Sequence, residues 1–253
     1  MIKLELWEDH GWMPAIRGMR NPMNSWDKSD SKIINSTLEP REIAPGVEVM
    51  EHVPCEPYVS VGEKDHELMM NLREAGTDHR KYMRMIIVWV DITAPLYWWK
   101  EFDTYKVGTV ANSCSTMHKI HAKEFTLDDF SHERLFKTTY SKRRPIDRLQ
   151  DTIDELNYWR EQYLAAKKND IHSPVWMLDG EREATPHDIW YNMIQLLPSS
   201  YNQKRTLMFS YENLASMYRA RKNHKLDEWR EFCKWMEGLP YSEIITGEKK
   251  NAE

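Results

Sequence analysis

Hydrophobic positions in the first half of this chain follow a two-residue period, which predicts strands. Ile2, Leu4 and Leu6 alternate with polar residues over positions 2–8, and Val47–Val53 shows a similar pattern. Tyr82–Ile92 is rich in Ile, Val, Met and Trp, which indicates a strand buried on at least one face. The first half therefore predicts three strands.

Turn and cap residues between these strands predict a turn and two helices. Pro54 and Pro57 predict a turn after the second strand. Leucines at helical spacing predict a helix over Glu63–Ala75, with Gly76 as its C-terminal cap. The run Thr93-Ala94-Pro95 predicts an N-cap and a proline in the first turn of an aromatic helix.

Between the first two predicted elements, Gly11–Ser31 contains several Pro, Gly, Asn and Ser residues. These residue types favour turns and break regular structure. We expect a loop-rich segment around a short helix.

The second half is mostly helical in its spacing. Asp147–Lys168 carries apolar residues three and four positions apart, which predicts a long amphipathic helix. Thr185-Pro186-His187-Asp188 has the spacing of a capping box and predicts a helix that ends at Leu196. Two more helices are predicted, one near 200–222 and one over 225–237.

Strands with a crossing helix, followed by a helical half, predict an α/β fold of the α+β kind. No internal repeat, low-complexity tract or linker divides the 253 residues. We therefore expect one domain over residues 1–246 and a frayed, charged tail over 247–253.

Composition and charge narrow the function classes. Apolar residues make up 41% and charged residues 30%, an ordinary globular balance, and the net charge of -5 argues against a general nucleic-acid binder. No apolar run approaches the roughly 20 residues that span a bilayer, and no signal-peptide pattern is present. Three cysteines without a CxxC pair favour a reducing compartment. We expect a cytoplasmic protein without membrane or nucleic-acid partners.

The short motifs of common enzyme classes are absent: there is no GxGxxG, GxxxxGK[ST], HExxH or GxSxG. The most informative stretch is residues 77–119, where Lys106 and Gly108 precede the small polar run Asn112-Ser113-Cys114-Ser115-Thr116. A lysine beside glycine and several hydroxyls offers one charge and several donors to an anionic ligand. A solvated, Ser-rich turn has the same spacing, so both interpretations stay open.

A metal site is a competing interpretation of the next segment, which holds His118, His121, Asp128, Asp129 and His132. Two histidines and a carboxylate can hold Zn or Fe. However, an HxxH spacing in a loop without a second anchoring motif is more typical of exposed or hydrogen-bonded histidines. We assign no metal.

Lys142-Arg143-Arg144 is a basic run directly before the long helix. It suits either a nucleic-acid patch or a solvated approach to that helix. The negative net charge of the chain favours a solvated approach to the helix.

The stretch 77–119 resembles the flavin-dependent thymidylate synthases. In that family a Gly-His segment precedes a strand that ends near Ala-Pro, and an aromatic helix leads to an Arg-His-Arg motif and then to a Ser of the nucleotide site. The matching positions here are His79, Ala94-Pro95, Thr104-Tyr105-Lys106, and Cys114 between Ser113 and Ser115.

The departures from the family are substantial. Arg-His-Arg has become Thr104-Tyr105-Lys106, which keeps one positive charge of two and replaces the imidazole with a phenol. An Asn-Glu pair has become Ala111-Asn112, which removes a carboxylate, and an Arg-Tyr pair has become Thr116-Met117.

A second stretch, residues 196–236, resembles the C-terminal region of the same family. The matching pieces are Leu197-Pro198, Tyr201, Arg221 (or Arg219, since the match needs a one-residue gap), His224 and Glu228-Trp229-Arg230. Arg221, His224 and Glu228 share one face if this stretch stays helical. A solvated charged face is the alternative.

The resemblance implies FAD-dependent methylation of dUMP to dTMP, with methylenetetrahydrofolate as the one-carbon donor and NADPH as the hydride source, in a homotetramer. The residues that it assigns to the cofactor are His79, Tyr105, Lys106, Asn112 and His224. Those that it assigns to the nucleotide are Ser113, Cys114, Ser115, Arg219 and Arg221, with Arg221 as the catalytic residue near the pyrimidine.

Two points remain open within the resemblance. The substituted motif also fits a diverged homologue that binds a nucleotide or another partner without catalysis. For the tetramer, Trp98 and Trp99 are expected to be exposed aromatics at a subunit interface, since one helix cannot bury every ring against its own core.

Overall fold

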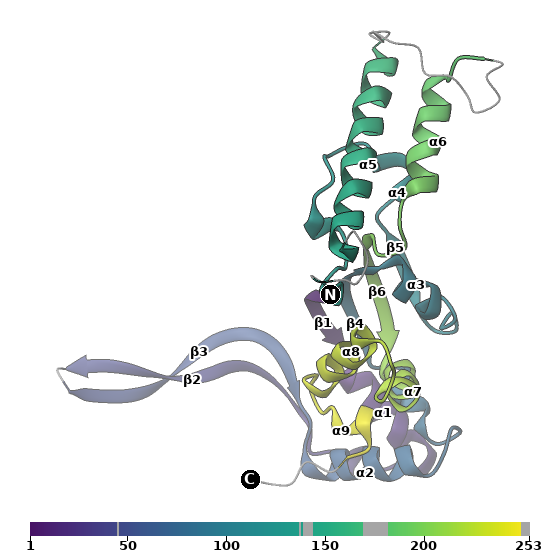
Figure 1. Ribbon diagram of the computed structural model, residues 1–253. Coiled ribbons are helices and arrows are strands. Elements are labelled where there is room, and N and C mark those ends of the chain that lie inside the picture. The colour runs from purple at the N-terminus through teal and green to yellow at the C-terminus, as the bar shows by residue number, and fades with distance from the viewer. Residues whose placement is uncertain (45, 137, 139–143, 169–181, 249–253) are drawn as a thin grey trace. The chain divides into compact units, whose positions relative to one another are not determined.

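The computed structural model describes residues 1–44, 46–136, 138, 144–168 and 182–248 of a mixed α/β protein (Figure 1). Its contacts divide the chain into two compact units. Unit 1 comprises Met1–Leu6, Val90–Leu207 and Lys225–Phe232, and unit 2 comprises Trp7–Trp89, Met208–His224 and Cys233–Glu253. The expectation of a single domain over 1–246 stays a prediction.

The described strands form two sheets. Strands β1, β4, β6 and β5 form a four-stranded sheet in that order, and β2 and β3 form an antiparallel hairpin. The strands are β1 (Lys3–His10), β2 (Lys32–Ala44), β3 (Val47–Ser60), β4 (Ile87–Pro95), β5 (Val110–Ser113) and β6 (Asn202–Ser210).

Helices fill most of the remaining described chain. The α-helices are α1 (Trp12–Arg20), α2 (Glu63–Glu74), α3 (Leu96–Phe102), α4 (Thr116–Lys119), α5 (Pro145–Lys167), α6 (Pro186–Leu196), α7 (Tyr211–Arg221), α8 (Asp227–Glu237) and α9 (Glu243–Thr246). The 3₁₀ helices are η1 (Asn21–Met23), η2 (Trp26–Lys28), η3 (Arg80–Arg84) and η4 (Leu127–Asp129). None of these described helices is both long and apolar enough to cross a membrane.

The local signals that predicted β1, α2, α5, α6 and α8 are confirmed. Gly76 follows α2 with φ of 111°, a backbone conformation that glycine adopts without strain. At α6, the Thr185 hydroxyl accepts a hydrogen bond from the Asp188 N–H (3.3 Å), and the Asp188 carboxylate accepts one from the Thr185 N–H (2.9 Å). The predicted capping box is therefore formed.

The predicted strand Tyr82–Ile92 and the predicted helix start at Thr93 are shifted. Tyr82 lies in η3, and β4 runs two residues past Thr93 to Pro95, with buried and half-buried residues alternating. Pro95 stands at the N-cap position of α3 and offers no side-chain cap. The first helical N–H groups, of Leu96 and Tyr97, instead donate to backbone carbonyl groups in the 199–201 segment, both at 3.0 Å.

The helix predicted near 200–222 is wrong in its first half. Residues 202–210 form β6, and α7 begins only at Tyr211. The Ser210 hydroxyl accepts a hydrogen bond from the Asn213 N–H at 3.2 Å, which caps the helix. Leu207 and Phe209 are buried at a two-residue spacing, so the pattern is that of a strand.

One N-terminal prediction is confirmed and another needs correction. Gly11–Ser31 contains the short helix α1 as expected, and its Pro14 is tolerated because a proline in the first turn of a helix costs no backbone hydrogen bond. The turn predicted at Pro54 and Pro57 is absent, since β3 continues through both to Ser60. Prolines are tolerated there because β2–β3 has two edge strands, and Pro54 pairs with Ser36 beside a register shift.

Unit 1 contains two groups of buried side chains. One joins α5 and α6 and includes Ile153, Leu156 and Met193. The other is aromatic and includes Trp98 and Trp99, which are 0% and 1% exposed. The expectation that these two tryptophans are exposed is therefore wrong, since α8 supplies further rings that cover them: Trp229 and Phe232 lie 4.8 and 5.8 Å from the Trp98 ring.

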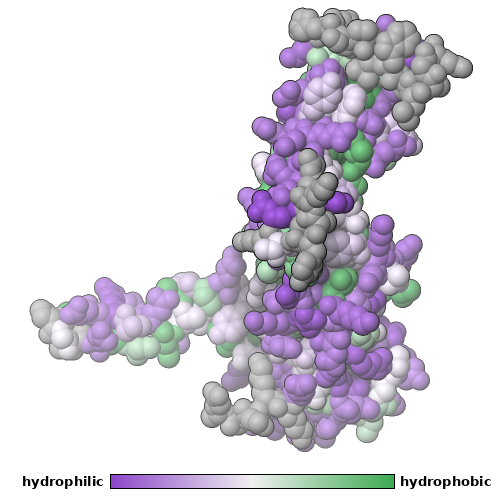
Figure 2. All heavy atoms as spheres, viewed as in Figure 1, coloured by the Kyte–Doolittle hydropathy of each residue, from purple (hydrophilic) through white to green (hydrophobic). Residues whose placement is uncertain are grey.

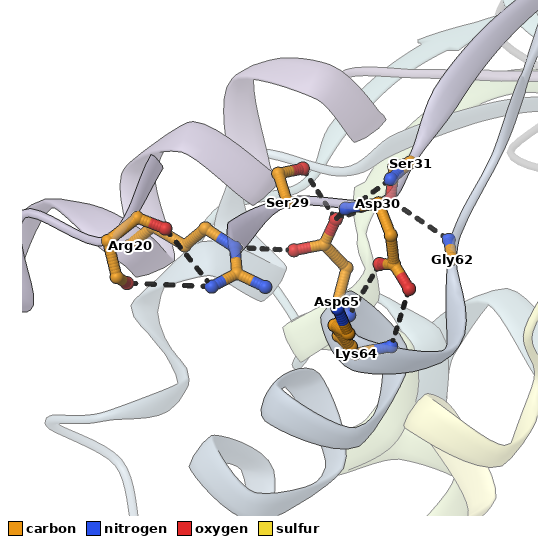
Figure 3. Close-up of polar contacts among 8 residues, drawn as sticks. Arg20, Ser29, Asp30, Ser31, Gly62, Lys64 and Asp65 are labelled. Carbon is orange, nitrogen blue, oxygen red and sulfur yellow. Dashed lines mark hydrogen bonds and ion pairs between the residues drawn. The ribbon is translucent and has the colours of Figure 1, made fainter. Parts of the chain in front are cut away.

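Unit 2 contains a buried ion pair. Arg20 of α1 and Asp65 of α2 are 4% and 0% exposed, and the Arg20 Nε donates to the Asp65 carboxylate at 2.6 Å (Figure 3). The same carboxylate accepts hydrogen bonds from Ser29, Asp30 and Ser31, at 2.6 to 3.2 Å. These bonds connect two helices to the base of the β2–β3 hairpin.

The β2–β3 hairpin carries apolar side chains on its surface, where Figure 2 shows hydrophobic patches. Leu38, Ile43 and Met50 are 54%, 59% and 60% exposed. Directly opposed pairs such as Pro40 and Met50 lie on one face of the ribbon.

Candidate functional site

Lys106 lies in a turn that follows α3. The Thr109 hydroxyl donates a hydrogen bond to the Tyr105 carbonyl and closes this turn, and Gly108 has φ of 74°. Lys106 is exposed, and none of the hydrogen bonds or ion pairs of the described residues involves it. Its charge is therefore available to a ligand.

The aromatic helix α3 fixes the start of this turn. The Trp99 indole N–H donates to the Gln203 carbonyl at 3.0 Å, and the Trp229 indole N–H donates to the Glu101 carboxylate at 3.0 Å. The Tyr105 ring packs edge-on against Trp229, with ring centroids 5.8 Å apart. A buried cluster thus holds the residue that directly precedes Lys106.

The small polar loop lies at the far end of β5. The Cys114 N–H donates to the Lys204 carbonyl at 2.9 Å, and the Gln203 amide donates to the Cys114 carbonyl at 2.9 Å. The Ser115 hydroxyl accepts a hydrogen bond from the His118 N–H at 3.1 Å and keeps its own hydrogen to donate. Asn112, Ser113, Cys114 and Ser115 are all exposed.

Lys106 lies in the turn before β5, and the Ser113–Ser115 loop begins at the last residue of that strand. The strand has four residues, so at about 3.3 Å per residue it separates the two ends by roughly 10 Å. The arrangement offers two contact points along one strand to an extended ligand.

Two neighbouring cations on β6 already have carboxylate partners. The Arg205 guanidinium lies 4.1 Å from the Trp99 ring centroid, and its Nη1 is 2.6 Å from an Asp103 oxygen. The Lys204 Nζ is 2.9 Å from the Asp91 carboxylate. These contacts occupy the two β6 cations, whereas Lys106 is exposed and makes no ion pair among the described residues.

Arg205 and Gln203 were not expected near this loop. Predicting a helix near 200–222 placed them in the wrong element. The signal that would have found them is the alternation of Leu207 and Phe209, together with the β-branched Thr206 just before them and the break at Pro198.

The other predicted site residues belong to unit 2. His79 is exposed at the N-cap position of η3, and Arg219 is exposed in the last turn of α7. Arg221 and His224 are half-buried, and the His224 N–H donates to the Arg221 carbonyl at 2.9 Å. The loop residues 105–115 belong to unit 1.

Arg221, His224 and Glu228 do not share a helix face. Helix α7 ends at Arg221 and α8 begins at Asp227, so His224 lies between two helices. Glu228 is 7% exposed and accepts a hydrogen bond from the Tyr97 hydroxyl. Burial and this carboxylate raise the pKa of Tyr97 above its usual value. Glu228 therefore stabilises unit 1 from its interior.

The histidines of the 118–132 segment have other contacts. His121 packs on the Tyr163 ring at 4.8 Å, and burial together with Lys167 lowers its pKa. His132 Nδ1 lies 2.8 Å from the Phe130 carbonyl oxygen. Among the described residues, no three His, Cys, Asp or Glu side chains converge as metal ligands would.

The basic run before α5 is described only in part. Arg144 pairs with Asp147 in the first turn of α5, at 2.6 Å. Lys142 and Arg143 lie outside the described residues.

Comparison with solved structures shows a likeness over nearly the whole chain. Thymidylate synthase X from Helicobacter pylori, in a crystal structure with FAD and dUMP, matches with a TM-score of 0.58 and 13% identity over 96% of both chains. A second structure of the flavin-dependent thymidylate synthase from the same organism, also complexed with FAD and dUMP, matches with a TM-score of 0.55 and 13% identity over 96% of this chain and 95% of that one. No protein-family model and no curated protein matches the sequence. The likeness shows the fold.

Proposed function

We propose that this chain binds FAD and dUMP and methylates dUMP to dTMP, with methylenetetrahydrofolate as carbon donor and NADPH as reductant. The observation that carries this proposal is the likeness of fold over 96% of the chain to structures that hold FAD and dUMP. The residue-level resemblance at 77–119 and 196–236 supports it independently, since it rests on the sequence.

The exposed donors around β5 fit part of a flavin dinucleotide. FAD carries two linked phosphates and is long, so it can use two contact points that a single phosphate cannot. Lys106 would supply a charge at one end of β5, and the Ser113 and Ser115 hydroxyls would donate at the other. FAD, when bound, supplies hydride-transfer chemistry that no side chain of the protein can perform.

The roles of the remaining site residues follow the resemblance. Tyr105, Asn112, His79 and His224 would contact the cofactor. Cys114 would take the place of a small polar residue beside the nucleotide. Arg219 and Arg221 would bind the nucleotide, and Arg221 would orient the pyrimidine through its planar, fixed pattern of donors.

A second candidate function is nucleotide binding without catalysis. The observation that favours it is Thr104-Tyr105-Lys106, which offers one cation where the family has two. Fewer cations leave more phosphate charge uncompensated and weaken the cofactor site. The same experiments separate the two candidates, because binding without dTMP formation supports the second.

The direct test is a titration of the purified protein with FAD and with dUMP, followed by an assay for dTMP. We expect saturable binding of both ligands, the absorbance of bound flavin, and dTMP formation when methylenetetrahydrofolate and NADPH are added. A protein that binds neither FAD nor dUMP contradicts both candidates.

Replacing Lys106 with Ala should weaken FAD or dUMP binding by roughly 10- to 100-fold, because a charge-assisted hydrogen bond to phosphate contributes about 1.5–3 kcal/mol. Lys100→Ala removes an exposed lysine from α3 and serves as the matched control. Cys114→Ser should change little, because both residues place a small polar atom in the loop. Unchanged affinity of Lys106→Ala for both ligands would place the phosphate contact elsewhere.

The proposed enzyme would also be a homotetramer. Light scattering at micromolar concentration should then give four times the 30.3 kDa of one chain. A monomeric mass would count against this part of the proposal.

A further inference from the structure

Unit 2 contains a groove of about 470 Å³ that none of the candidate site residues lines. Its walls come from the end of β1, the start of α1, the last residues of β3 and the turn that follows α8. Volumes of roughly 300–1,000 Å³ are typical of small-molecule sites. The groove is large enough for a small organic ligand.

Aromatic rings form much of the wall. The rings of Trp12 and Tyr241 lie 5.1 Å apart at 63°, and Tyr211 packs edge-on against Trp12 from the interior of unit 2 at 5.1 Å. The Tyr241 hydroxyl accepts a hydrogen bond from the Val61 N–H at 2.8 Å, which holds this ring in place. Tyr58 lines the groove and is 52% exposed. The wall thus combines two fixed rings with one that is open to solvent.

One carboxylate belongs to the same wall. Asp9 is half-buried, and its Oδ2 accepts a hydrogen bond from the Trp12 indole N–H at 3.1 Å. In the described part of the chain its Oδ1 accepts no hydrogen bond. Burial raises the pKa of Asp9 because the ionised form loses solvation, and this outweighs the Trp12 hydrogen bond and the neighbouring His10. No Lys or Arg lines the groove. The groove therefore has space for a cation beside Asp9, and the Asp9 Oδ1 can contact it.

A glycine fixes the backbone between Asp9 and Trp12 in this wall. Gly11 connects Asp9 to Trp12 with φ of 98°, and a Cβ at this position would lie 1.9 Å from the Met85 carbonyl oxygen. Only glycine permits that close approach. The carboxylate and the indole therefore keep their relative positions through a turn that tolerates no side chain.

We propose that this groove binds a small organic cation with an alkylated ammonium head. Cations are attracted to the faces of Trp and Tyr rings, and an adjacent carboxylate adds a charge of the opposite sign. An anion would be repelled by Asp9, and a neutral apolar molecule would leave the Asp9 oxygen uncompensated. This ligand class is independent of FAD and dUMP.

Choline is a suitable probe, because 3,3-dimethylbutan-1-ol has the same shape without the charge. Each is titrated against the wild-type protein without flavin or nucleotide, with binding followed by calorimetry and by tryptophan fluorescence. We expect choline to bind saturably and the neutral analogue to bind at least 10-fold more weakly.

Two variants locate the site. Asp9→Asn should weaken choline binding by about 10-fold, because it removes the charge but keeps an oxygen for the Trp12 indole. Tyr58→Ala should weaken it by about 3- to 30-fold through loss of one ring face, and Tyr58 is exposed enough to be replaced without loss of the fold. Glu56→Gln removes a neighbouring exposed carboxylate outside the groove and should leave the affinity unchanged.

Three results would overturn the proposal. They are failure of choline to bind the wild type, equal affinity for the neutral analogue, and unchanged choline affinity in both Asp9→Asn and Tyr58→Ala. Because these titrations use neither FAD nor dUMP, failure here is distinguishable from failure of the proposed enzyme.

Discussion

Replacing Asp65 with Ala should lower the free energy of unfolding by about 3–5 kcal/mol. The substitution leaves the Arg20 guanidinium buried at 4% exposure without its charged partner, and breaking a buried pair from one side costs about that much. It also removes the acceptor for Ser29 and Ser31 at the base of the hairpin. Urea or guanidinium unfolding of the two proteins measures the difference.

The exposed pair between Arg41 and Glu51 provides the control. These side chains are 66% and 48% exposed, and an ion pair in water contributes at most about 1 kcal/mol. Glu51→Ala should therefore change stability by less than 1 kcal/mol. An Asp65→Ala variant as stable as Glu51→Ala would show that the buried network contributes little to stability.

Asp65 also makes the free energy of unfolding depend on pH. Burial alone would raise the pKa of Asp65, but the hydrogen bonds from the two serines and Arg20 outweigh it and hold the pKa below 3.8. The folded-state pKa is depressed, so this stabilisation is present above pH 3.8 and is lost as the pH falls through the folded-state pKa. In Asp65→Asn, unfolding free energy measured below pH 4 should fall less steeply than in the wild type.

Sequence signals located the helices whose ends are set by their own residues. The capping box at Thr185 and the glycine after α2 act within a few positions, so they were visible without the fold. β2 was not predicted and β3 was predicted too short, because a strand in a hairpin depends on a partner chain segment and not on local preference. β6 was missed because its first four residues are polar and hide the alternation that follows.

The geometry of the candidate site also depends on tertiary structure that the sequence does not show. The order of Lys106 and the serine loop along the chain is visible in the sequence, but β5 between them sets their separation. The break between α7 and α8 separates Arg221 from Glu228, which the three- and four-residue spacing did not reveal. Burial of Trp98 depends on rings from α8, more than 100 positions away. Tertiary packing decided each of these points.

Replacing Trp229 with Ala should also cost about 3–5 kcal/mol of unfolding free energy, since truncating a buried large aromatic ring leaves a cavity. Trp229 is 0% exposed and packs against Trp98 and Phe102, and its indole N–H is bonded to Glu101. Trp229→Phe keeps part of the ring volume and should lose less. Denaturant unfolding at neutral pH measures both variants.

Trp26 offers a matched control, because its side chain is 50% exposed and it lies in unit 2. Trp26→Ala should change stability by less than 1 kcal/mol, since less buried surface is lost.

The Trp229 ring also supports Tyr105, which starts the turn that carries Lys106. Trp229→Phe should therefore weaken FAD binding while the protein stays folded, because the turn loses part of its support. If Trp229→Phe binds FAD as the wild type does, the position of Lys106 is set by the turn itself and not by the aromatic cluster beneath it.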